Sequence, residues 1–358
     1  MSRLIRAVID GAALRHNLEV IRQRAPGARV MAVVKANAYG HGLVQTALAL
    51  PTADAFAVAR LQEGVRLREC GVRTPIVLLE GVFTPEQLLE AIRFELELVV
   101  HDALQLALLA AEPAAHRLAL WIKVDTGMNR LGFRPEAFRA AYEQLCALRP
   151  APRTVRLMTH LAAADEPDGV MTREQLKRFA AATHGVPGER SIANSAGIFA
   201  AVPVGGEWVR PGLALYGASP FAQSNAAQLG LRPVMRLETS VIAVRRVPRG
   251  ETVGYGGAWR AEREARIAIV AAGYGDGLPR SLPNGAVVQV AGRRAPLVGR
   301  VSMDMIAVDV SAIEAVGVGT PVLLWGESQP VEELARSAGT IPYELLCAVS
   351  ERVPLEPA

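Results

Sequence analysis

A lysine that could do chemistry stands at the end of an apolar run early in the chain. Residues 30–34 read Val-Met-Ala-Val-Val, and Lys35 follows directly, ahead of small residues and two glycines. An apolar run without polar alternation is typical of a strand buried on both faces. Because desolvating an ammonium is costly, Lys35 is predicted to be either half of an ion pair or an amine of lowered pKa that acts as nucleophile or base.

Polar side chains also end other apolar runs in the first two thirds of the chain. A histidine or asparagine in such a place is more often a structural cap than a ligand. Several polar ends together favour a shared site, because catalytic groups of an α/β barrel lie at the carboxyl ends of its strands. These ends are Lys35, the pair Lys123 and Asp125, His160, the pair Asn194 and Ser195, and Arg210.

The elements that must position these residues alternate along the chain. Between the apolar runs, Leu and Ala recur at three- and four-residue steps, which is the spacing of helices. Eight buried strands alternating with helices are the pattern of a TIM barrel. A doubly wound open sheet is the alternative, but no Gly-x-Gly-x-x-Gly turn follows the first strand. The expected strands are residues 30–34, 56–60, 76–81, 97–102, 120–125, 155–160, 191–195 and 208–216, and the expected helices are 61–70, 85–93, 103–111, 135–148 and 172–182.

Beyond about residue 225 the pattern changes to β-rich segments separated by turn signals such as Asn284-Gly285. We therefore expect a barrel domain over residues 1–225 and a mostly antiparallel β domain over residues 226–358. The β domain's expected strands are residues 234–247, 265–272, 286–290, 307–310 and 321–325, and only residues 331–338 look helical. Near the start of the chain, Asp10 is expected to cap a helix whose apolar face carries Leu14, Leu18 and Ile21.

The bulk composition excludes several classes of function. The 358 residues carry 39 basic and 35 acidic side chains mixed along the chain, so the net charge of +4 indicates no nucleic-acid surface. No apolar run is long enough to span a membrane, and the first ten residues contain no signal-peptide core. Three separated cysteines favour a reducing cytoplasm, and the six histidines lack the spacing of a metal site.

The stretch Lys-Ala-Asn-Ala-Tyr-Gly-His-Gly at residues 35–42 resembles the cofactor-binding lysine motif of the alanine racemases. The resemblance runs from Ile9 to Pro354. It implies a TIM barrel followed by a β domain, with pyridoxal 5'-phosphate held as a Schiff base by Lys35, a reaction that suits a deprotonated amine. The other matching motifs are residues 123–132, 159–160, 193–197, 210–217, 253–256, 273–277, 302–304 and 342–344.

The resemblance also implies which residues meet the cofactor. Arg210 matches the arginine that faces the pyridine nitrogen. Because an arginine keeps its proton, the ring should be a weaker electron sink, which disfavours transamination. The phosphate needs backbone N–H groups and hydroxyls. The matching cofactor-binding positions are Tyr39, Asn194, Ser195, Gly212, Leu213 and Tyr343.

Racemisation needs a base on each face of the substrate's Cα. The resemblance implies Lys35 for one face and Tyr255 for the other. A free tyrosine is a poor base at neutral pH, and the resemblance implies that His160, linked toward Arg210, assists it.

The substrate carboxylate is assigned in the same way. Arg130 and the backbone of Met303 match the positions that hold it, and a guanidinium fork suits that role. Lys123 matches a lysine that carries a carbamate in some related enzymes. Asn129 stands where some relatives have glycine.

Taken together, the motifs imply an alanine racemase, an isomerase that interconverts L-alanine and D-alanine and supplies D-alanine for peptidoglycan. The family forms a head-to-tail homodimer in which Tyr255 and Met303 come from the partner, and no nucleic acid or membrane partner is expected. A racemase for a wider set of amino acids is the first alternative. A non-catalytic pyridoxal-phosphate-binding barrel protein and a decarboxylase of the same architecture are further alternatives, and the motifs around Tyr255 and Met303 favour a racemase over both.

Overall fold

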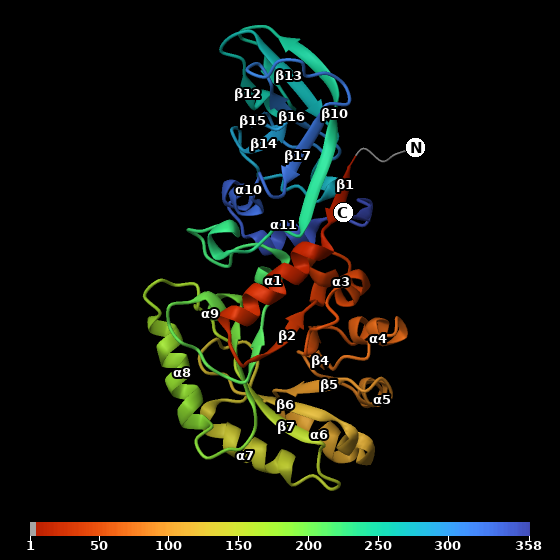
Figure 1. The fold of residues 1–358 in the computed structure, drawn as a ribbon, viewed down its shortest axis with the longest axis vertical. Helices are drawn as coiled ribbons and strands as arrows, with labels where there is room; N and C mark the ends of the chain where they lie inside the picture. Colours follow the sequence, from red (N-terminus) through yellow and green to blue (C-terminus); the bar gives the residue numbers. More distant parts are fainter. Residues whose placement is uncertain (1–4) are drawn as a thin grey trace.

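The computed structural model describes residues 5–358 and shows an α/β barrel and a β-rich domain stacked end to end (Figure 1). Eight parallel strands close the barrel, each pairing with the next in chain order and β9 pairing with β2. This confirms the TIM barrel that the alternating pattern predicts. The strands are β2 (Arg29–Val33), β3 (Ala55–Val58), β4 (Ile76–Leu78), β5 (Glu97–Val100), β6 (Ala119–Lys123), β7 (Thr154–Met158), β8 (Arg190–Asn194) and β9 (Trp208–Arg210).

The last barrel strand is shorter than the sequence pattern predicts. β9 ends at Arg210 and not at residue 216. Proline lacks the N–H that a strand ladder needs, so Pro211 ends the pairing. Residues Leu213–Tyr216 form a 3-10 turn instead, and all four are buried. The expected strand was therefore too long by this turn.

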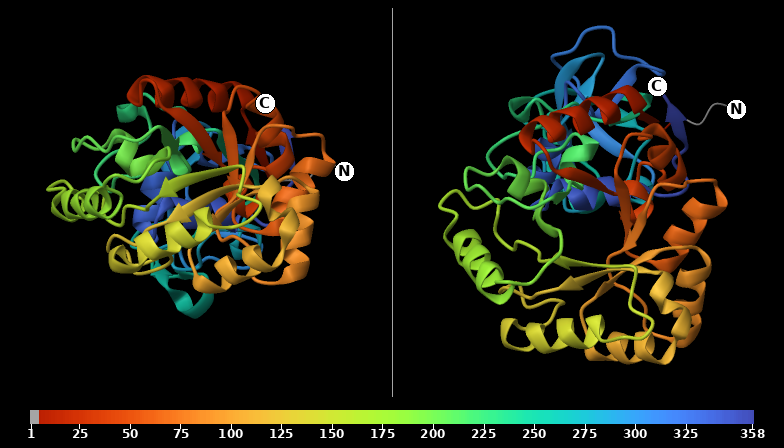
Figure 2. Two further views of the ribbon diagram at one scale, coloured as in Figure 1. Left: turned by 90° about the horizontal axis from the view of Figure 1, so that it is seen from below. Right: turned by 60° about the horizontal axis from the view of Figure 1, so that its bottom comes forward.

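Helices form an outer layer around the barrel strands (Figure 2). Asp10 caps the first of them by accepting hydrogen bonds from the N–H groups of Ala12 and Ala13, as its position predicts. No helix within residues 5–358 is both long and apolar enough to cross a membrane. The helices are α1 (Gly11–Arg24), α3 (Leu43–Ala49), α4 (Leu61–Glu69), α5 (Pro85–Arg93), α6 (Ala103–Ala111), α7 (Pro135–Cys146), α8 (Val170–Ala182) and α9 (Ser195–Phe199), with a short turn, α2 (Lys35–Tyr39), after β2.

The second domain is built on an eight-stranded sheet in the order β13-β16-β15-β14-β17-β10-β1-β18, and β10 also pairs with β13. Every neighbouring pair is antiparallel except β1 and β18, which confirms the expected β domain. A two-stranded ribbon of β11 and β12 stands apart from this sheet. The strands are β1 (Arg6–Ile9), β10 (Met235–Val247), β11 (Thr252–Val253), β12 (Trp259–Arg260), β13 (Ala265–Val270), β14 (Val287–Val290), β15 (Arg293–Val298), β16 (Ile306–Asp309), β17 (Pro321–Trp325) and β18 (Leu355–Pro357).

Several elements of this domain differ from expectation. The strands β11, β12, β15 and β18 were not expected, and the expectation of one helix was wrong, because α10 (Val331–Ser337) is followed by α11 (Pro342–Ala348). β1 lies in this sheet although it precedes the barrel in the chain. The division at residue 225 stays a prediction, and the N-terminal strand crosses it.

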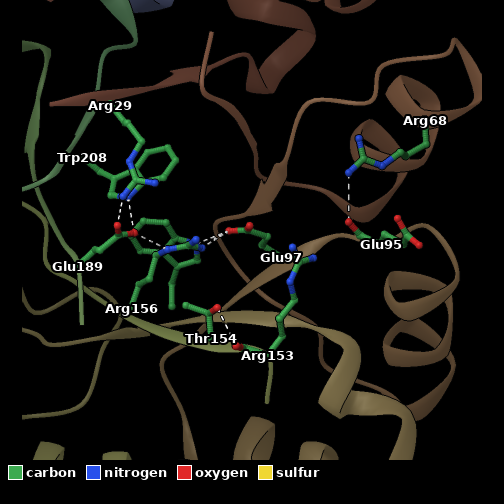
Figure 3. A network of polar contacts seen from close by, with 10 residues as sticks. Arg29, Arg68, Glu95, Glu97, Arg153, Thr154, Arg156, Glu189 and Trp208 are labelled. Carbon is green, nitrogen blue, oxygen red and sulfur yellow. Dashed lines mark hydrogen bonds and ion pairs between the residues drawn. The ribbon is translucent and has the colours of Figure 1, made fainter. Parts of the chain in front are cut away.

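Aromatic rings and ion pairs pack together at the amino-terminal end of the barrel (Figure 3). Arg156 donates to Glu189 at 2.8 Å and to Glu97 at 3.1 Å. The indole N–H groups of Trp121 and Trp208 donate to the same two carboxylates, at 2.7 and 3.0 Å. The two indole rings meet edge to face. We call these five residues the barrel floor; they close the end of the barrel opposite to the polar strand ends.

Candidate active site

The polar strand ends predicted from the sequence meet at one mouth of the barrel. Lys35 follows β2, Lys123 ends β6, His160 follows β7, Asn194 ends β8, and Arg210 ends β9. The charges of Lys35, Lys123 and Arg210 all act on the His160 side chain, which is close enough to sense each of them. The barrel therefore gathers these side chains as the expectation of a shared site requires.

The residues after Lys35 adopt an unusual backbone conformation. Ala36, Asn37, Ala38 and Tyr39 all have φ of 53° or 54°, so α2 is a turn of left-handed helix. The turn directs the Tyr39 ring into the core, where it stacks on Tyr216 with ring centroids 4.8 Å apart. Tyr39 is buried, and burial raises its pKa above the ordinary value. Its hydroxyl is therefore protonated at neutral pH and available as a hydrogen-bond donor.

Ser195 and the backbone at Gly212 lie beside Tyr39, and we call these three residues the anion cradle. The Ser195 hydroxyl oxygen accepts the N–H groups of Gly212 at 2.9 Å and of Ala214 at 3.2 Å, which leaves its own hydrogen free to donate. A Cβ added to Gly212 would lie 2.3 Å from the Tyr39 hydroxyl oxygen, so only glycine allows this approach. Asn194 caps the helix that begins at Ser195 by accepting the Gly197 N–H at 2.9 Å. Hydroxyl donors beside a closely approaching glycine backbone are the features a phosphate needs.

Leu213 and Tyr343 both adjoin residues of this cradle: Leu213 follows Gly212 in the chain, and Tyr343 lies near Tyr39. Leu213 is fully buried in the 3-10 turn after Gly212. Tyr343 comes from α11, and its ring centroid is 5.9 Å from that of Tyr39. Burial raises the pKa of Tyr343 to about 12, so its hydroxyl also keeps its hydrogen.

Arg210 is buried at the centre of the mouth. One terminal nitrogen donates to the Ser191 hydroxyl at 2.6 Å, and the other to the Thr159 carbonyl at 2.6 Å and to Nδ1 of His160 at 3.2 Å. The second terminal nitrogen also donates to the Ile192 carbonyl at 3.2 Å, and Nε donates to none of the described residues. Burial lowers the pKa of Arg210 to about 10, which still keeps the guanidinium charged at neutral pH.

His160 is held neutral beside this arginine. Burial, and then the charge of Arg210, lower the pKa of His160 to about 2. Because Nδ1 faces a donor, the remaining hydrogen of the neutral ring belongs on Nε2. The buried amide of Gln175 fixes the backbone here by donating to the His160 carbonyl at 3.0 Å.

The mouth carries an excess of positive charge. Lys123 is buried, and burial together with the charges of Arg210 and Arg130 lowers its pKa to about 8. Burial and then Arg130 also lower the pKa of Lys35. The nearby Asp125 carboxylate is occupied by the N–H groups of Gly127 and Asn129, each at 3.0 Å. Such a cluster favours an anionic ligand, because an anion relieves the repulsion among the cations.

Arg130 lies at the exposed edge of the mouth, on the loop that Asp125 organises. Asn129, just before it, has φ of 57°, in the left-handed region. Asparagine tolerates this region better than most residues other than glycine. Asparagine at this position is therefore compatible with the loop conformation.

Tyr255 and Met303 do not join this group within one chain. Tyr255 lies in the turn between β11 and β12. The strand β12 lies in the part of the β domain away from the barrel (Figure 1). Its side chain is 67% exposed, and that of Met303, between β15 and β16, is 53% exposed. The chain therefore presents two incomplete halves of the expected site.

Two side chains near the mouth carry no motif that singles them out in the sequence. Gln175 supports His160, as described above, from the middle of α8. Glu63 accepts the N–H of Ala36, directly after Lys35, at 2.7 Å. A glutamate three residues after a helix start is a capping signal, and that signal could have drawn attention to Glu63.

Comparisons with known proteins agree with this architecture. The model of the alanine racemase N-terminal domain matches residues 9–220, and that of the alanine racemase C-terminal domain matches residues 234–356. The chain is 50% identical over 354 residues to the alanine racemase of Nitrosospira multiformis, covering 99% of each chain. The crystal structure of the biosynthetic alanine racemase from Pseudomonas aeruginosa is similar over the whole of both chains, with a TM-score of 0.97 and 44% identity. The alanine racemase structure from Bartonella henselae with covalently bound pyridoxal phosphate also covers both chains, with a TM-score of 0.90 and 28% identity.

Proposed function

The chain belongs to the alanine racemase family, and from that premise we propose that it interconverts L-alanine and D-alanine with pyridoxal 5'-phosphate as its cofactor. The observation that carries the proposal is the barrel mouth, where a half-buried lysine, an anion cradle and a buried arginine converge. We propose the same division of domains as the sequence suggests, with the barrel carrying the cofactor. The product D-alanine would serve peptidoglycan synthesis.

The residues of the mouth fit the cofactor. Lys35 would hold it covalently, since its lowered pKa favours the neutral amine that adds to an aldehyde. Tyr39, Ser195 and the backbone at Gly212 would hold the phosphate, supported by Asn194, Leu213 and Tyr343. When bound, pyridoxal phosphate withdraws electrons from the substrate and makes the hydrogen on Cα acidic.

Arg210 sets how strongly the ring nitrogen is polarised. A guanidinium that keeps its proton at neutral pH can donate a hydrogen bond from Nε but does not transfer the proton. The nitrogen would then stay unprotonated. An unprotonated ring nitrogen would favour return of the proton to the substrate carbon over transamination.

Proton transfer on the two faces of Cα is assigned to two residues. Lys35 would take or return the proton on one face. Tyr255 of the partner subunit would do so on the other, in a head-to-tail homodimer. His160 supports this arrangement, because its Nε2–H can donate to a tyrosine oxygen while Nδ1 accepts from Arg210.

The substrate carboxylate would be held by Arg130 and by the backbone of Met303 of the partner subunit. Arg130 is exposed within one chain, which suits a residue that meets a substrate entering between two subunits. We also place the protein in the cytoplasm, where its three cysteines, all free thiols in the structure, would remain reduced.

A coupled assay tests the proposal directly. Purified protein incubated with L-alanine should form D-alanine, detected with a D-amino-acid oxidase, and activity should depend on added pyridoxal phosphate after the cofactor is removed. Serine, lysine and arginine in place of alanine measure specificity. Borohydride reduction and peptide mapping should place the pyridoxyl group on Lys35, with exposed Lys177 as the internal control. Absence of D-alanine, or label on another lysine, would contradict the assignment.

A further inference from the structure

The left-handed turn after Lys35 needs an external support. It contains four consecutive non-glycine residues, Ala36 to Tyr39, with positive φ. The left-handed conformation is unfavourable for residues that carry a Cβ, because the Cβ comes too close to the following carbonyl oxygen. Such a conformation persists only when the surrounding structure holds it in place. The turn also connects Lys35 to Tyr39, so its shape sets where the amine and the phenol lie relative to each other.

Glu63 supplies that support at the end of the turn next to Lys35. One carboxylate oxygen accepts the Ala36 N–H at 2.7 Å. The other accepts the N–H groups of Ala59 and Arg60, both at 3.0 Å. Glu63 itself lies in the first turn of α4. Its carboxylate therefore bridges two loops at the barrel mouth, the loop after β2 and the loop after β3.

The far end of the turn is held separately. His41 Nδ1 lies 2.8 Å from the Tyr39 carbonyl and 3.1 Å from the Ala38 carbonyl, as the donor in the neutral ring. At Gly40, an added Cβ would lie 2.1 Å from the Leu346 carbonyl oxygen, so α11 packs directly against the backbone. Loss of the Glu63 bridge would therefore free the Lys35 end while the Tyr39 end stays anchored.

We infer that Glu63 is a positioning residue for Lys35, acting through its bridge to the Ala36 N–H and not through its charge. The inference rests on the proposed function and adds a residue to it. The distinction between bridge and charge can be tested, because Glu80 offers a matched control. Both carboxylates act electrostatically on the Lys35 amine in the same direction. The Glu80 carboxylate, however, pairs with the exposed Arg60 guanidinium at 3.4 Å and not with the turn.

Three variants separate the two effects. Glu63→Asp keeps the charge but is one methylene too short to reach both loops. Glu63→Gln keeps the length but loses acceptor capacity, because its amide nitrogen must face N–H groups on one side. Glu80→Gln removes a nearby charge and leaves the bridge intact. Circular dichroism and thermal unfolding establish that each variant is folded.

The first measurement requires no turnover. Pyridoxal phosphate is added to cofactor-free protein, and its capture by Lys35, with formation of a C=N bond and release of water, is followed by borohydride trapping and peptide mapping. Misplacement of a reacting group by about 1 Å slows a reaction on the order of tenfold to a hundredfold. Capture should therefore slow by at least about tenfold in both Glu63 variants and stay within about twofold of the parent in Glu80→Gln.

The second measurement uses loaded enzyme and reports on one face of the substrate. Exchange of the Cα hydrogen with deuterated solvent should fall more for D-alanine, which Lys35 serves, than for L-alanine. Equal loss for both enantiomers in a folded variant would indicate a merely structural role and overturn the inference. The inference would also be overturned if Glu63→Asp captured pyridoxal phosphate at the parental rate while Glu80→Gln captured it slowly. That result would show that the charge near Lys35, and not the bridge, controls the capture rate. Failure of the parent protein to racemise alanine would instead contradict the proposed function, while the capture rates would still test Glu63.

Discussion

At the scale of single residues, burial and neighbouring cations set the protonation states of the side chains at the barrel mouth. His160 is neutral because burial and Arg210 lower its pKa to about 2. Burial and nearby arginines shift Lys35 and Lys123 toward their neutral amines. Arg210 keeps a fixed charge at the centre of the site. The side chains that must accept protons or react as nucleophiles are thus separated from the one that must hold a fixed charge.

Lys123 is expected to react with carbon dioxide. With a pKa of about 8, far more of this amine is neutral near pH 8 than for an ordinary lysine, and the neutral amine is the nucleophile. Arg130 and Arg210 would stabilise the negative carbamate. At fixed dissolved carbon dioxide labelled with carbon-13, a carbamate resonance should grow as the pH rises through 8, because protonation removes the nucleophile below it.

Lys123→Met is the control for this resonance, which should vanish in the variant while the fold is retained. A signal that persists in Lys123→Met would place the carbamate elsewhere. No signal in the parent protein at any pH between about 7 and 9 would show that the excess positive charge is neutralised in another way.

Tyr255→Phe should separate the two faces of the substrate. The change removes one proposed base and leaves the barrel mouth untouched, since Tyr255 is exposed in the turn between β11 and β12 of the β domain. Solvent deuterium should still exchange into D-alanine through Lys35, whereas exchange into L-alanine should be lost. This asymmetry is opposite to that expected for Glu63→Gln. Equal loss for both enantiomers would contradict the assignment of one base to each face.

At the scale of elements, the two ends of the barrel have different roles. The carboxyl ends of the strands carry the reactive side chains, whereas the floor holds Arg156 between Glu97 and Glu189 (Figure 3). Arg156 also lies over the rings of Trp121 and Trp208, at 5.2 and 5.6 Å from their centroids. The floor thus ties β5, β6, β7 and β9 together at a distance from the chemistry.

Arg156→Met should destabilise the barrel without changing the chemistry. The change leaves Glu97, which is 15% exposed, without its arginine partner, while Glu189 keeps its ion pair with Arg29, and breaking a buried ion pair in this way costs roughly 3 kcal/mol. Urea denaturation should show the loss, while racemase activity per folded molecule stays close to that of the parent. Arg246→Met, which removes an exposed pair with Glu264, should cost less than about 1 kcal/mol. Similar losses in both variants would mean that the floor contributes no more than a surface ion pair.

At the scale of the whole molecule, the separation of Tyr255 from Lys35 makes assembly part of the proposed mechanism. The barrel mouth lies next to α11, whereas β12 lies in the part of the β domain away from the barrel (Figure 1). A symmetric head-to-tail dimer can bring the mouth of one subunit to the turn of the other, and it forms two equivalent sites.

Mixing two inactive variants should therefore restore activity. Homodimers of Lys35→Ala carry a defect in both sites, and so do homodimers of Tyr255→Phe. A mixed dimer contains one site with both defects and one site with neither, so co-refolded protein should recover activity above the sum of the two parents. Subunit exchange is verified with a size tag on one chain. If exchange occurs and activity stays at the parental sum, the site lies within one chain.

Several of these features follow from the sequence alone because their causes are local. Apolar runs that alternate with helical spacing predict all eight barrel strands, since buried parallel strands need no polar alternation. Lys35, Lys123, His160 and Arg210 could be assigned to one mouth, since the carboxyl ends of barrel strands all face the same way. The tertiary structure confirms this convergence, and their proposed roles await the experiments above.

Other features were decided only by contacts between distant parts of the chain. β1 is four residues long and pairs with β10 and β18, and nothing local in so short a strand specifies partners that far away. The left-handed turn after Lys35 opposes the intrinsic preference of its residues, so its support by Glu63 from a neighbouring loop was not foreseeable from propensity. Motifs assign Tyr255 to the same site as Lys35, and only the folded chain shows that one copy holds them apart, because the position of a turn in space depends on how whole domains pack.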